Sequence, residues 1–348
     1  MHVLVTGSLG YVAPSVIHSL RKSFPDAVLT GVDTGWFIGS LTDGGRPPES
    51  HLDSQRFVDV RDMTAADLAG VTHVVHLAAL SNDPLGDTWA EVTEAINLRA
   101  SLRLLDLSQQ AGVKGFVFAS SASVYGAGSA TPRTEASEVN PLTAYARSKI
   151  DFERQAAERL SGEMVLTCLR FSTACGWSPR TRLDLVLNDF VATALSTGRI
   201  EVLSDGTPWR PLVHVDDMGR AIAWALSDDR RQQPEKALTV QVGRDDWNFQ
   251  VGQLASLVAE VLGGIEVSIN EQAPPDARSY RLDFTRWREI APRHQPVTDI
   301  TKAIQQLADN LRHLDLTDFR QGKLMRLNVV RDLVDQGALT GDLAWAVA

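Results

Sequence analysis

Short apolar runs alternate with amphipathic stretches over the first half of the chain. Runs of this kind, each followed by a segment with helical periodicity, are typical of buried parallel strands joined by crossover helices. The expected strands lie at residues 2–6, 28–33, just before 59–62, 71–79, 115–120 and 165–169. One expected helix follows the first strand and ends near Lys22, and the helical patterns after the fourth and fifth strands cover residues 87–111 and 143–160. The pattern predicts an α/β fold built on a doubly wound parallel sheet.

The alternation breaks down after residue 172. Strand-like runs recur at 212–215 and 238–242, whereas 176–211 and the segment after 244 are mixed, and the tail from about 298 to 348 is mostly amphipathic helix. A chain that passes more than once between two domains explains the late strands. We therefore expect one domain from residues 1–172 plus about 212–243. We expect a smaller, mixed α/β domain from about 173–211 plus 244–348.

A glycine-containing turn follows the first expected strand. Gly7 allows a tight turn, Gly10 allows the backbone to approach a pyrophosphate, and Ala13 allows the next helix to pack closely on the strand. The N-terminus of that helix offers unpaired N–H groups and the positive end of a dipole. The strand–turn–helix context predicts a dinucleotide-binding site.

An acidic residue, Asp33, ends the second strand. A carboxylate at this position can accept hydrogen bonds from both adenosine ribose hydroxyls and would repel a 2′-phosphate. No arginine follows it directly, so NAD is favoured over NADP. The alternative is an ordinary turn aspartate.

Small and hydroxyl-bearing residues end the next strands. The fourth strand closes on Ala78 and Ala79, which leave space for a flat cofactor, and the fifth leads into the serine-rich segment 120–126. Hydroxyl groups at the carboxyl edge of an open parallel sheet point toward the ligand crevice. Without further chemistry downstream, this segment would be interpreted as a hydroxyl-rich turn.

The further chemistry is a Tyr145–Lys149 pair. A spacing of four residues on a helix places both side chains on one face. A phenol has a pKa of about 10, and a neighbouring ammonium group favours its ionised form. The pair can therefore act as a base toward a hydroxyl group, although a helix surface pair is the simpler interpretation of the spacing alone.

The composition limits the kinds of binding partner that we expect. With a net charge of −9, the protein should repel nucleic acid and anionic membranes, so an anionic substrate needs a local arginine cluster. The two cysteines, Cys168 in an apolar run and Cys175 after a strand end, imply no disulfide framework and fit a reducing cytoplasm. The opening MHVLVTG enters a strand directly, so we expect no signal peptide, and no apolar run reaches the roughly 20 residues of a membrane span.

Taken in order, the motifs resemble a known superfamily. GxxGxxA, Asp33, DVRD, HLAA, SSASVYG, YxxxK, RFSTACG and WRPLVHVDD resemble those of the extended short-chain dehydrogenase/reductases, and within them the nucleotide-sugar epimerase/dehydratase group. The resemblance runs from Val3 to about Asp283 and implies a Rossmann-type fold, bound NAD, a nucleoside-diphosphate sugar substrate and no metal. It also implies a homodimer through helices near 87–111 and 143–160.

The resemblance assigns roles residue by residue. Tyr145 would be the acid/base, Lys149 would hold the nicotinamide ribose, and Ser121 would bond the reacting sugar oxygen. The implied NAD-binding set also includes Gly7, Gly10, Tyr11, Val12, Asp33, Asp59, Val60, Leu77, Ala78, Ala79 and Asn97. The implied substrate-binding set is Ser81, Ser121, Ser123, Thr173, Asn188, Arg210 and Arg278.

Departures from the family pattern bear on the reaction. Dehydratases of the group carry Asp-Glu after the catalytic Ser or Thr, and decarboxylating relatives carry a Glu; this chain has Ala122 and Ser123 there. Ser81 and Thr173 replace a Lys and an Asn that are common in galactose 4-epimerases. We therefore expect a cytoplasmic, UDP-glucose 4-epimerase-like enzyme acting at C4. The alternatives are a nucleotide 4-ketosugar reductase and a non-catalytic dinucleotide sensor.

Overall fold

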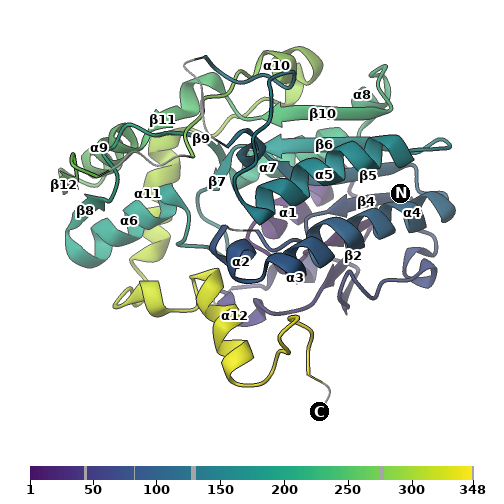
Figure 1. Cartoon of the computed structure of the whole chain (residues 1–348), viewed down its shortest axis with the longest axis horizontal. Coiled ribbons are helices and arrows are strands. Elements are labelled where there is room, and N and C mark those ends of the chain that lie inside the picture. Colours follow the sequence, from purple (N-terminus) through teal and green to yellow (C-terminus); the bar gives the residue numbers. More distant parts are fainter. Residues whose placement is uncertain (43–44, 82, 127–130, 274–277, 347–348) are drawn as a thin grey trace.

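A seven-stranded parallel sheet forms the centre of the computed structural model, which describes residues 1–348 except 43–44, 82, 127–130, 274–277 and 347–348 (Figure 1). Every pairing within the sheet is parallel. In spatial order the strands are β10 (Ala237–Val242), β6 (Val165–Phe171), β5 (Gly115–Ser121), β4 (His73–His76), β1 (His2–Thr6), β2 (Val28–Asp33) and β3 (Ser54–Phe57). The predicted α/β fold with a Rossmann-type sheet is confirmed.

The strand order reverses beside β1. From β1 the chain adds β2 and β3 on one side, then crosses to add β4, β5 and β6 on the other. In sheets of this kind, ligands bind at the carboxyl ends of the strands where the order reverses. The predicted glycine turn follows β1 and therefore lies at this point.

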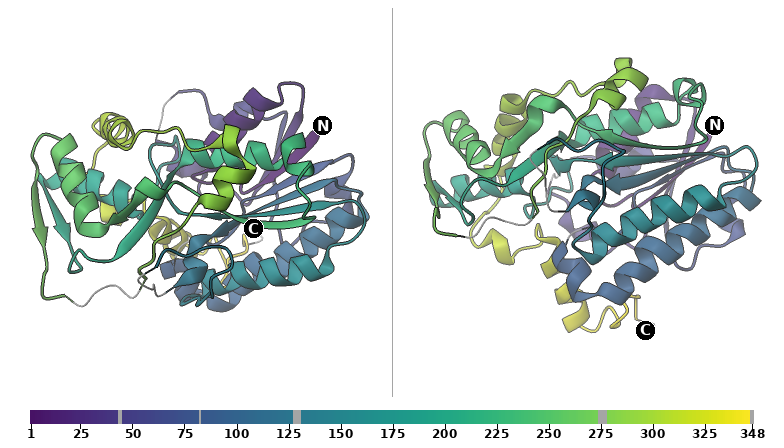
Figure 2. Two further views of the ribbon diagram at one scale, coloured as in Figure 1. Left: turned by 90° about the horizontal axis from the view of Figure 1, so that it is seen from above. Right: turned by 45° about the horizontal axis from the view of Figure 1, so that its top comes forward.

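Helices cover both faces of the sheet, as Figure 2 shows. One face carries α1 (Ala13–Ser23) and α7 (Val215–Ala225), which share a core with β1. The other face carries α4 (Ser101–Gln110) and α5 (Ala144–Arg159), preceded by α2 (Asp83–Thr88), α3 (Ala90–Glu94) and a π-helical segment, η4 (Ala95–Ala100). Thr143 caps α5 by accepting a hydrogen bond from the Ala146 N–H group, which fixes where this helix begins.

A smaller unit stands beside the sheet and has its own apolar core. It contains the three strands β11 (Asn248–Gln250), β9 (Trp209–His214) and β7 (Thr173–Cys175), and the pair β12 (Glu266–Ile269) and β8 (Arg199–Val202). Its helices are α6 (Val186–Thr197), α9 (Val251–Val261) and α11 (Ile300–Leu311). The mixed α/β character predicted for the later part of the chain is therefore present.

Short helical segments complete the described structure. The helices α8 (Asp228–Arg231) and α10 (Thr285–Ile290) lie near the β10 edge. Single 3₁₀ turns are η1 (Ile38–Ser40), η2 (Pro48–His51), η3 (Ala65–Leu68), η5 (Ala122–Tyr125), η6 (Asp245–Trp247), η7 (Pro292–His294) and η8 (Phe319–Gln321).

The C-terminal segment does not stay with the smaller unit, where we had placed it. Its last helix, α12 (Arg326–Asp335), returns to the large sheet, and Val330 and Leu343 share a core with Leu4 and Val32 (Figure 1). Trp345 Nε1 also donates to the Thr34 carbonyl oxygen, at 2.6 Å. Apolar side chains on α12 and after it explain the return. The tail is also less helical than predicted, because only α11, η8 and α12 are helical within residues 298–346.

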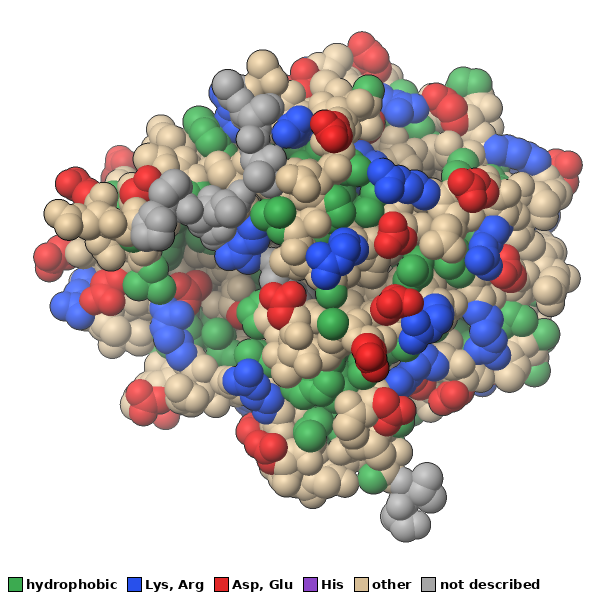
Figure 3. Space-filling view, viewed as in Figure 1, with side chains coloured by type: hydrophobic (Ala, Val, Ile, Leu, Met, Phe, Trp, Pro, Cys, Tyr) green, Lys and Arg blue, Asp and Glu red, His purple; other side chains and the backbone are tan. Residues whose placement is uncertain are grey.

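The surface fits a protein with mixed charge. In Figure 3, acidic and basic side chains are interspersed over the face that carries α4 and α5. Among the described residues, no helix has both the length and the apolar character needed to cross a membrane. The homodimer expected through this face stays a prediction.

Candidate functional site

A cavity of about 1,120 Å³ opens at the carboxyl edge of the sheet and extends into the smaller unit. Cavities for single small ligands usually measure about 300–1,000 Å³, so this one has room for two ligands. Its walls contain most of the residues expected from the sequence. They are Gly7, Gly10, Tyr11, Val12, Asp33, Asp59, Val60, Leu77, Ala78, Ala79, Ser81, Ser121, Ser123, Tyr145, Lys149, Thr173, Arg210 and Arg278.

Two expected binding residues, Asn97 and Asn188, lie behind the wall and not in it. The Asn97 amide accepts from the Leu80 N–H group at 2.8 Å and donates to the Leu80 carbonyl oxygen at 3.0 Å. Asn188 accepts from the Gly176 N–H group at 3.0 Å and donates to the Tyr11 hydroxyl oxygen at 3.0 Å. Both side chains are fully buried. Both amides satisfy backbone groups and position wall residues, and their direct contact with a ligand stays a prediction.

The glycine turn is shaped to receive a phosphate group. Gly7 has φ +74°, and a Cβ atom built on it would lie 2.7 Å from the Ala78 backbone nitrogen. The Gly10 N–H group donates to the Gly7 carbonyl oxygen at 3.0 Å, which closes the turn. Helix α1 begins just beyond, without a side-chain cap at Val12. The turn therefore leaves helix N-terminal N–H groups for an anion, as a dinucleotide requires.

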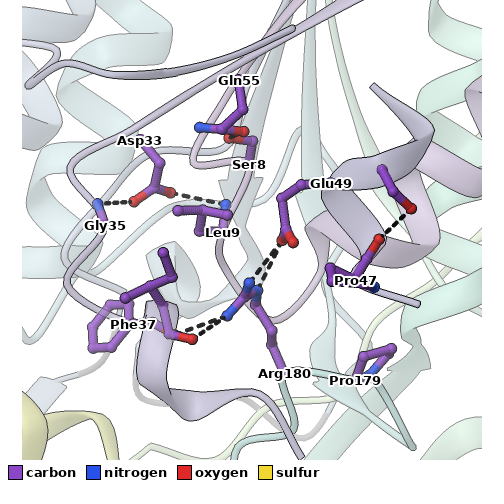
Figure 4. Close-up of polar contacts among 12 residues, drawn as sticks. Ser8, Leu9, Asp33, Gly35, Phe37, Pro47, Glu49, Gln55, Pro179 and Arg180 are labelled. Carbon is purple, nitrogen blue, oxygen red and sulfur yellow. Dashed lines mark hydrogen bonds and ion pairs between the residues drawn. The ribbon is translucent and has the colours of Figure 1, made fainter. Parts of the chain in front are cut away.

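Asp33 lies at the end of β2 beside this turn. Its carboxylate accepts from the Leu9 N–H group at 3.0 Å and from the Gly35 N–H group at 2.8 Å (Figure 4). Burial raises the pKa of Asp33, while the two N–H groups oppose this effect. A carboxylate held in this way keeps further acceptor positions for ribose hydroxyls.

Arg180 joins the smaller unit to the loop that follows β2. Its guanidinium pairs with Glu49 at 2.8 Å and donates to the carbonyl oxygens of Phe37 and Ile38 (Figure 4). The side chain is 2% exposed. Arg180 therefore fixes the wall next to Asp33 from a segment more than a hundred residues away, which no local pattern in the sequence indicated.

The predicted base and its partner lie together on α5. The Lys149 Nζ atom is 5.5 Å from the centroid of the Tyr145 ring and 4.5 Å from that of Phe118. It donates to the Ala119 carbonyl oxygen at 2.8 Å. Burial lowers the pKa of Lys149 to about 7. The helix thus brings phenol and amine to one wall of the cavity, as the four-residue spacing predicted.

Ser121 stands at the end of β5, on the same wall. Its Oγ atom accepts from the Ser123 N–H group at 3.2 Å and donates to the Ser123 Oγ atom at 2.9 Å. Ser121 therefore caps the turn η5 and presents its hydroxyl at the cavity wall. Ser121 and Tyr145 therefore line the same cavity.

A buried ionic network supports this wall from behind. Arg170 on β6 pairs with Glu153 on α5 through bonds of 2.6–3.1 Å and donates to the Tyr125 hydroxyl oxygen at 2.7 Å. Glu153 also accepts from the Ser120 hydroxyl, next to Ser121. The network ties together β5, β6, η5 and α5, which carry the reactive side chains.

Sequence reasoning missed several cavity arginines. Arg182 donates to the Ser81 Oγ atom at 2.9 Å and pairs with Asp184 through two bonds of 2.9 and 3.0 Å. Of the arginines that were missed, Arg182 lies in a loop, Arg199 begins β8, Arg320 lies in η8 and Arg326 begins α12, and no motif marks any of them. The arginines that line the cavity in the described structure are Arg182, Arg199, Arg210, Arg278, Arg320 and Arg326. The local arginine cluster that an anionic substrate needs is present in a chain of net charge −9.

The described residues contain no candidate metal-binding cluster, and both cysteines are buried. No group of three or more His, Cys, Asp or Glu side chains is placed there to hold a metal ion. Cys168 and Cys175 are buried, and burial raises the pKa of both thiols. Neither cysteine lines the cavity.

Comparisons with known proteins agree with this geometry. The model of the NAD dependent epimerase/dehydratase family matches residues 3–243. The chain is 28% identical over 237 residues to a Bacillus subtilis (strain 168) protein described as an uncharacterized UDP-glucose epimerase, YtcB, a match that covers 65% of this chain and 72% of that protein. It is 28% identical over 233 residues to a dTDP-glucose 4,6-dehydratase of Streptomyces griseus, which covers 64% of this chain and 68% of that enzyme.

A solved structure extends the likeness beyond the matched region. MoeE5 in complex with UDP-glucose and NAD superposes with a TM-score of 0.75 at 26% identity, over 90% of this chain and 99% of that one.

Proposed function

Because the chain belongs to the NAD dependent epimerase/dehydratase family, we propose that it inverts a stereocentre of a nucleoside-diphosphate sugar, at C4, through a transient ketone. NAD is the cofactor of this family, and the cavity fits it at the glycine turn and Asp33. The observation that carries the proposal is that Tyr145, Lys149 and Ser121 share a cavity with this dinucleotide site.

The side chains divide the work of the reaction. Tyr145 accepts the proton of a sugar hydroxyl and later returns it, while Lys149 stabilises the ionised phenol. Ser121 donates to the same sugar oxygen and keeps it in reach of Tyr145. When bound, NAD supplies a hydride acceptor and donor, so the sugar carbon can be oxidised and then reduced from its other face. No net redox change occurs.

The residues around Ser121 favour epimerisation over loss of water. Elimination needs an acid and a base of its own beside the substrate. Ala122 is buried and apolar, and the Ser123 hydroxyl is engaged by Ser121. Since known relatives include both epimerases and dehydratases, this local difference supports the first reaction.

The charge of the cavity supports a diphosphate-bearing substrate. Arg210 on β9 and Arg278 line the part of the cavity wall that belongs to the smaller unit. The glycine turn lines another part, at the edge of the large sheet. Guanidinium groups recognise phosphate oxygens through paired hydrogen bonds. UDP-glucose, which is bound in MoeE5, is the first substrate to assay.

Substitution of Tyr145 by Phe tests the proposal. Loss of the general base should lower turnover of UDP-sugars by about 10²–10⁴-fold. The measurement is the interconversion of UDP-glucose and its C4 epimer, followed by nuclear magnetic resonance. Circular dichroism and retention of NAD serve as controls for the fold.

Two results would contradict the proposal. Turnover above a few per cent of wild type in a folded Tyr145→Phe protein would remove Tyr145 from the mechanism. Stoichiometric consumption of NADH with a 4-ketosugar, without epimerisation, would make the protein a reductase.

A further inference from the structure

Arg326, the first residue of α12, is a buried cation in the cavity wall, outside the family-matched residues 3–243. It is 2% exposed. Its Nη2 atom donates to the Arg180 carbonyl oxygen at 2.7 Å, and its guanidinium lies 4.5 Å from the centroid of the Phe37 ring. Its Nη1 atom is buried without a hydrogen-bond partner among the described residues.

The charge of Arg326 also lacks a carboxylate partner within the described structure. The two arginines nearest to it electrostatically are compensated, because Arg182 pairs with Asp184 and Arg180 pairs with Glu49. Burial, followed by the charge of Arg182, lowers the pKa of Arg326 to about 9, while the Asp184 carboxylate, which is paired with Arg182, opposes this shift. A buried cation without a counterion is costly unless a ligand supplies the anion.

The surroundings of Arg326 indicate which anion this is. Phe37 belongs to the loop after β2, which follows Asp33. Arg180, whose carbonyl oxygen accepts from Arg326, donates to the Phe37 and Ile38 carbonyl oxygens of the same loop, so these contacts belong to the dinucleotide end of the cavity. Arg210, by contrast, lies on β9 in the smaller unit. The N-terminus of α12, a helix of ten residues, adds a positive dipole end at the same place.

We propose that Arg326 binds the diphosphate of NAD, so that the C-terminal segment completes the dinucleotide site begun by the glycine turn. The diphosphate provides the counterion that the chain itself does not place beside this guanidinium. Residues 342–345 hold the same end of the site, because Trp345 donates to Thr34 and Arg61 donates to the Asp342 and Leu343 carbonyl oxygens. The proposal rests on NAD binding and does not depend on which sugar reaction the enzyme performs.

The test compares Arg326→Gln with Arg331→Gln, since Arg331 is exposed on the same helix. Calorimetric titration of the cofactor-free proteins measures the Kd for NAD and for adenosine, and UDP is titrated into NAD-saturated protein. We expect Arg326→Gln to raise the Kd for NAD by about tenfold or more, the loss of one charged hydrogen bond. Adenosine and UDP should bind within about twofold of wild type, and Arg331→Gln should change none of these constants.

Three outcomes would overturn the assignment. An unchanged Kd for NAD removes Arg326 from the site. A loss confined to UDP assigns the guanidinium to the substrate's diphosphate. An equal loss for NAD and adenosine makes Arg326 a brace for the pocket, and not a ligand of the phosphates.

Thermal unfolding is a second measurement that tests the proposal even if the variant is difficult to saturate with ligand. Removal of an uncompensated charge should leave the Tm of the cofactor-free Arg326→Gln protein equal to or above that of wild type, and NAD should raise the Tm less than in wild type. Arg326→Lys, which keeps the charge, should recover part of the NAD-induced shift. A fall in the Tm of the cofactor-free protein with a normal NAD-induced shift would indicate a brace and refute the proposal.

Discussion

Arg170 and Arg326 are both buried arginines, but Arg170 is paired with a carboxylate and Arg326 is not. The Nε and Nη2 atoms of Arg170 bond to Glu153 and its Nη1 atom donates to Tyr125; burial alone would lower the pKa of Arg170, but Glu153 raises it above its ordinary value. Among the described residues, the Arg326 guanidinium contacts a backbone oxygen and an aromatic ring, and burial lowers its pKa. Both side chains are buried to nearly the same extent, so the two arginines differ in whether a carboxylate neutralises the charge.

This difference distinguishes a structural charge from a charge kept for a ligand. The Arg170 pair is complete without any ligand, and its role is to hold the wall that carries Ser121 and Tyr145. Arg326 is incomplete until an anion arrives. The same residue type thus stabilises the folded protein in one region and contributes to binding in the other.

Breaking the complete pair should have the largest effect on stability. Glu153→Gln leaves Arg170 buried with no counterion, so the free energy of unfolding should fall by about 3–5 kcal/mol. Denaturant unfolding of cofactor-free protein measures it. Glu158→Gln, exposed on the same helix, is the control and should change stability by less than about 0.5 kcal/mol. A loss under about 1 kcal/mol for Glu153→Gln would place the two arginines in one class.

Lys149, a buried cation that forms no salt bridge within the described structure, sharpens the comparison through pH. Its pKa is about 7 in the folded protein and about 10.4 when unfolded. Between these values the unfolded state binds more protons, so stability should rise with pH, by at most about 1.4 kcal/mol per unit. Unfolding of cofactor-free protein at pH 7 and pH 9 should show this rise in wild type. The rise should be missing in Lys149→Met; the same slope in both proteins would contradict the prediction.

The smallest expected effect lies at the end of the tail. Trp345→Phe removes the bond to the Thr34 carbonyl oxygen but keeps a ring in place. Because Trp345 is 47% exposed, we expect the free energy of unfolding to fall by about 0.5 kcal/mol and the Kd for NAD to rise about twofold. Calorimetric titration beside wild type measures it. A change as large as that of Arg326→Gln would shift the assigned role from one guanidinium to the tail as a whole.

The sequence allowed prediction of those parts that depend on local pattern. Apolar runs indicated the strands, the glycine turn after β1 indicated the dinucleotide end, and the four-residue spacing indicated that Tyr145 and Lys149 share a face of α5. Each of these signals lies within a few residues of chain, where periodicity and turn chemistry decide the outcome.

The remaining features depend on contacts between distant segments. Asn97 and Asn188 were expected to reach ligands, but their amides are used on backbone groups that only the folded chain brings near. Arg180 meets Glu49 across 131 residues of chain, and Arg326 meets Phe37 across most of the sequence. The return of α12 to the large sheet also has no marker beyond a few apolar residues. Partner choice for a buried polar group is a tertiary property, and no spacing in the sequence encodes it.

The return of α12 has a consequence for the order of synthesis. Leu4 is translated more than three hundred residues before Leu343, yet both belong to the same core. Chains usually fold from the N-terminus as they emerge, but this core stays open on one side until almost the whole described chain has been translated. A nascent chain therefore exposes apolar surface during most of its elongation, and chaperones that act on ribosome-bound chains would find their binding sites there.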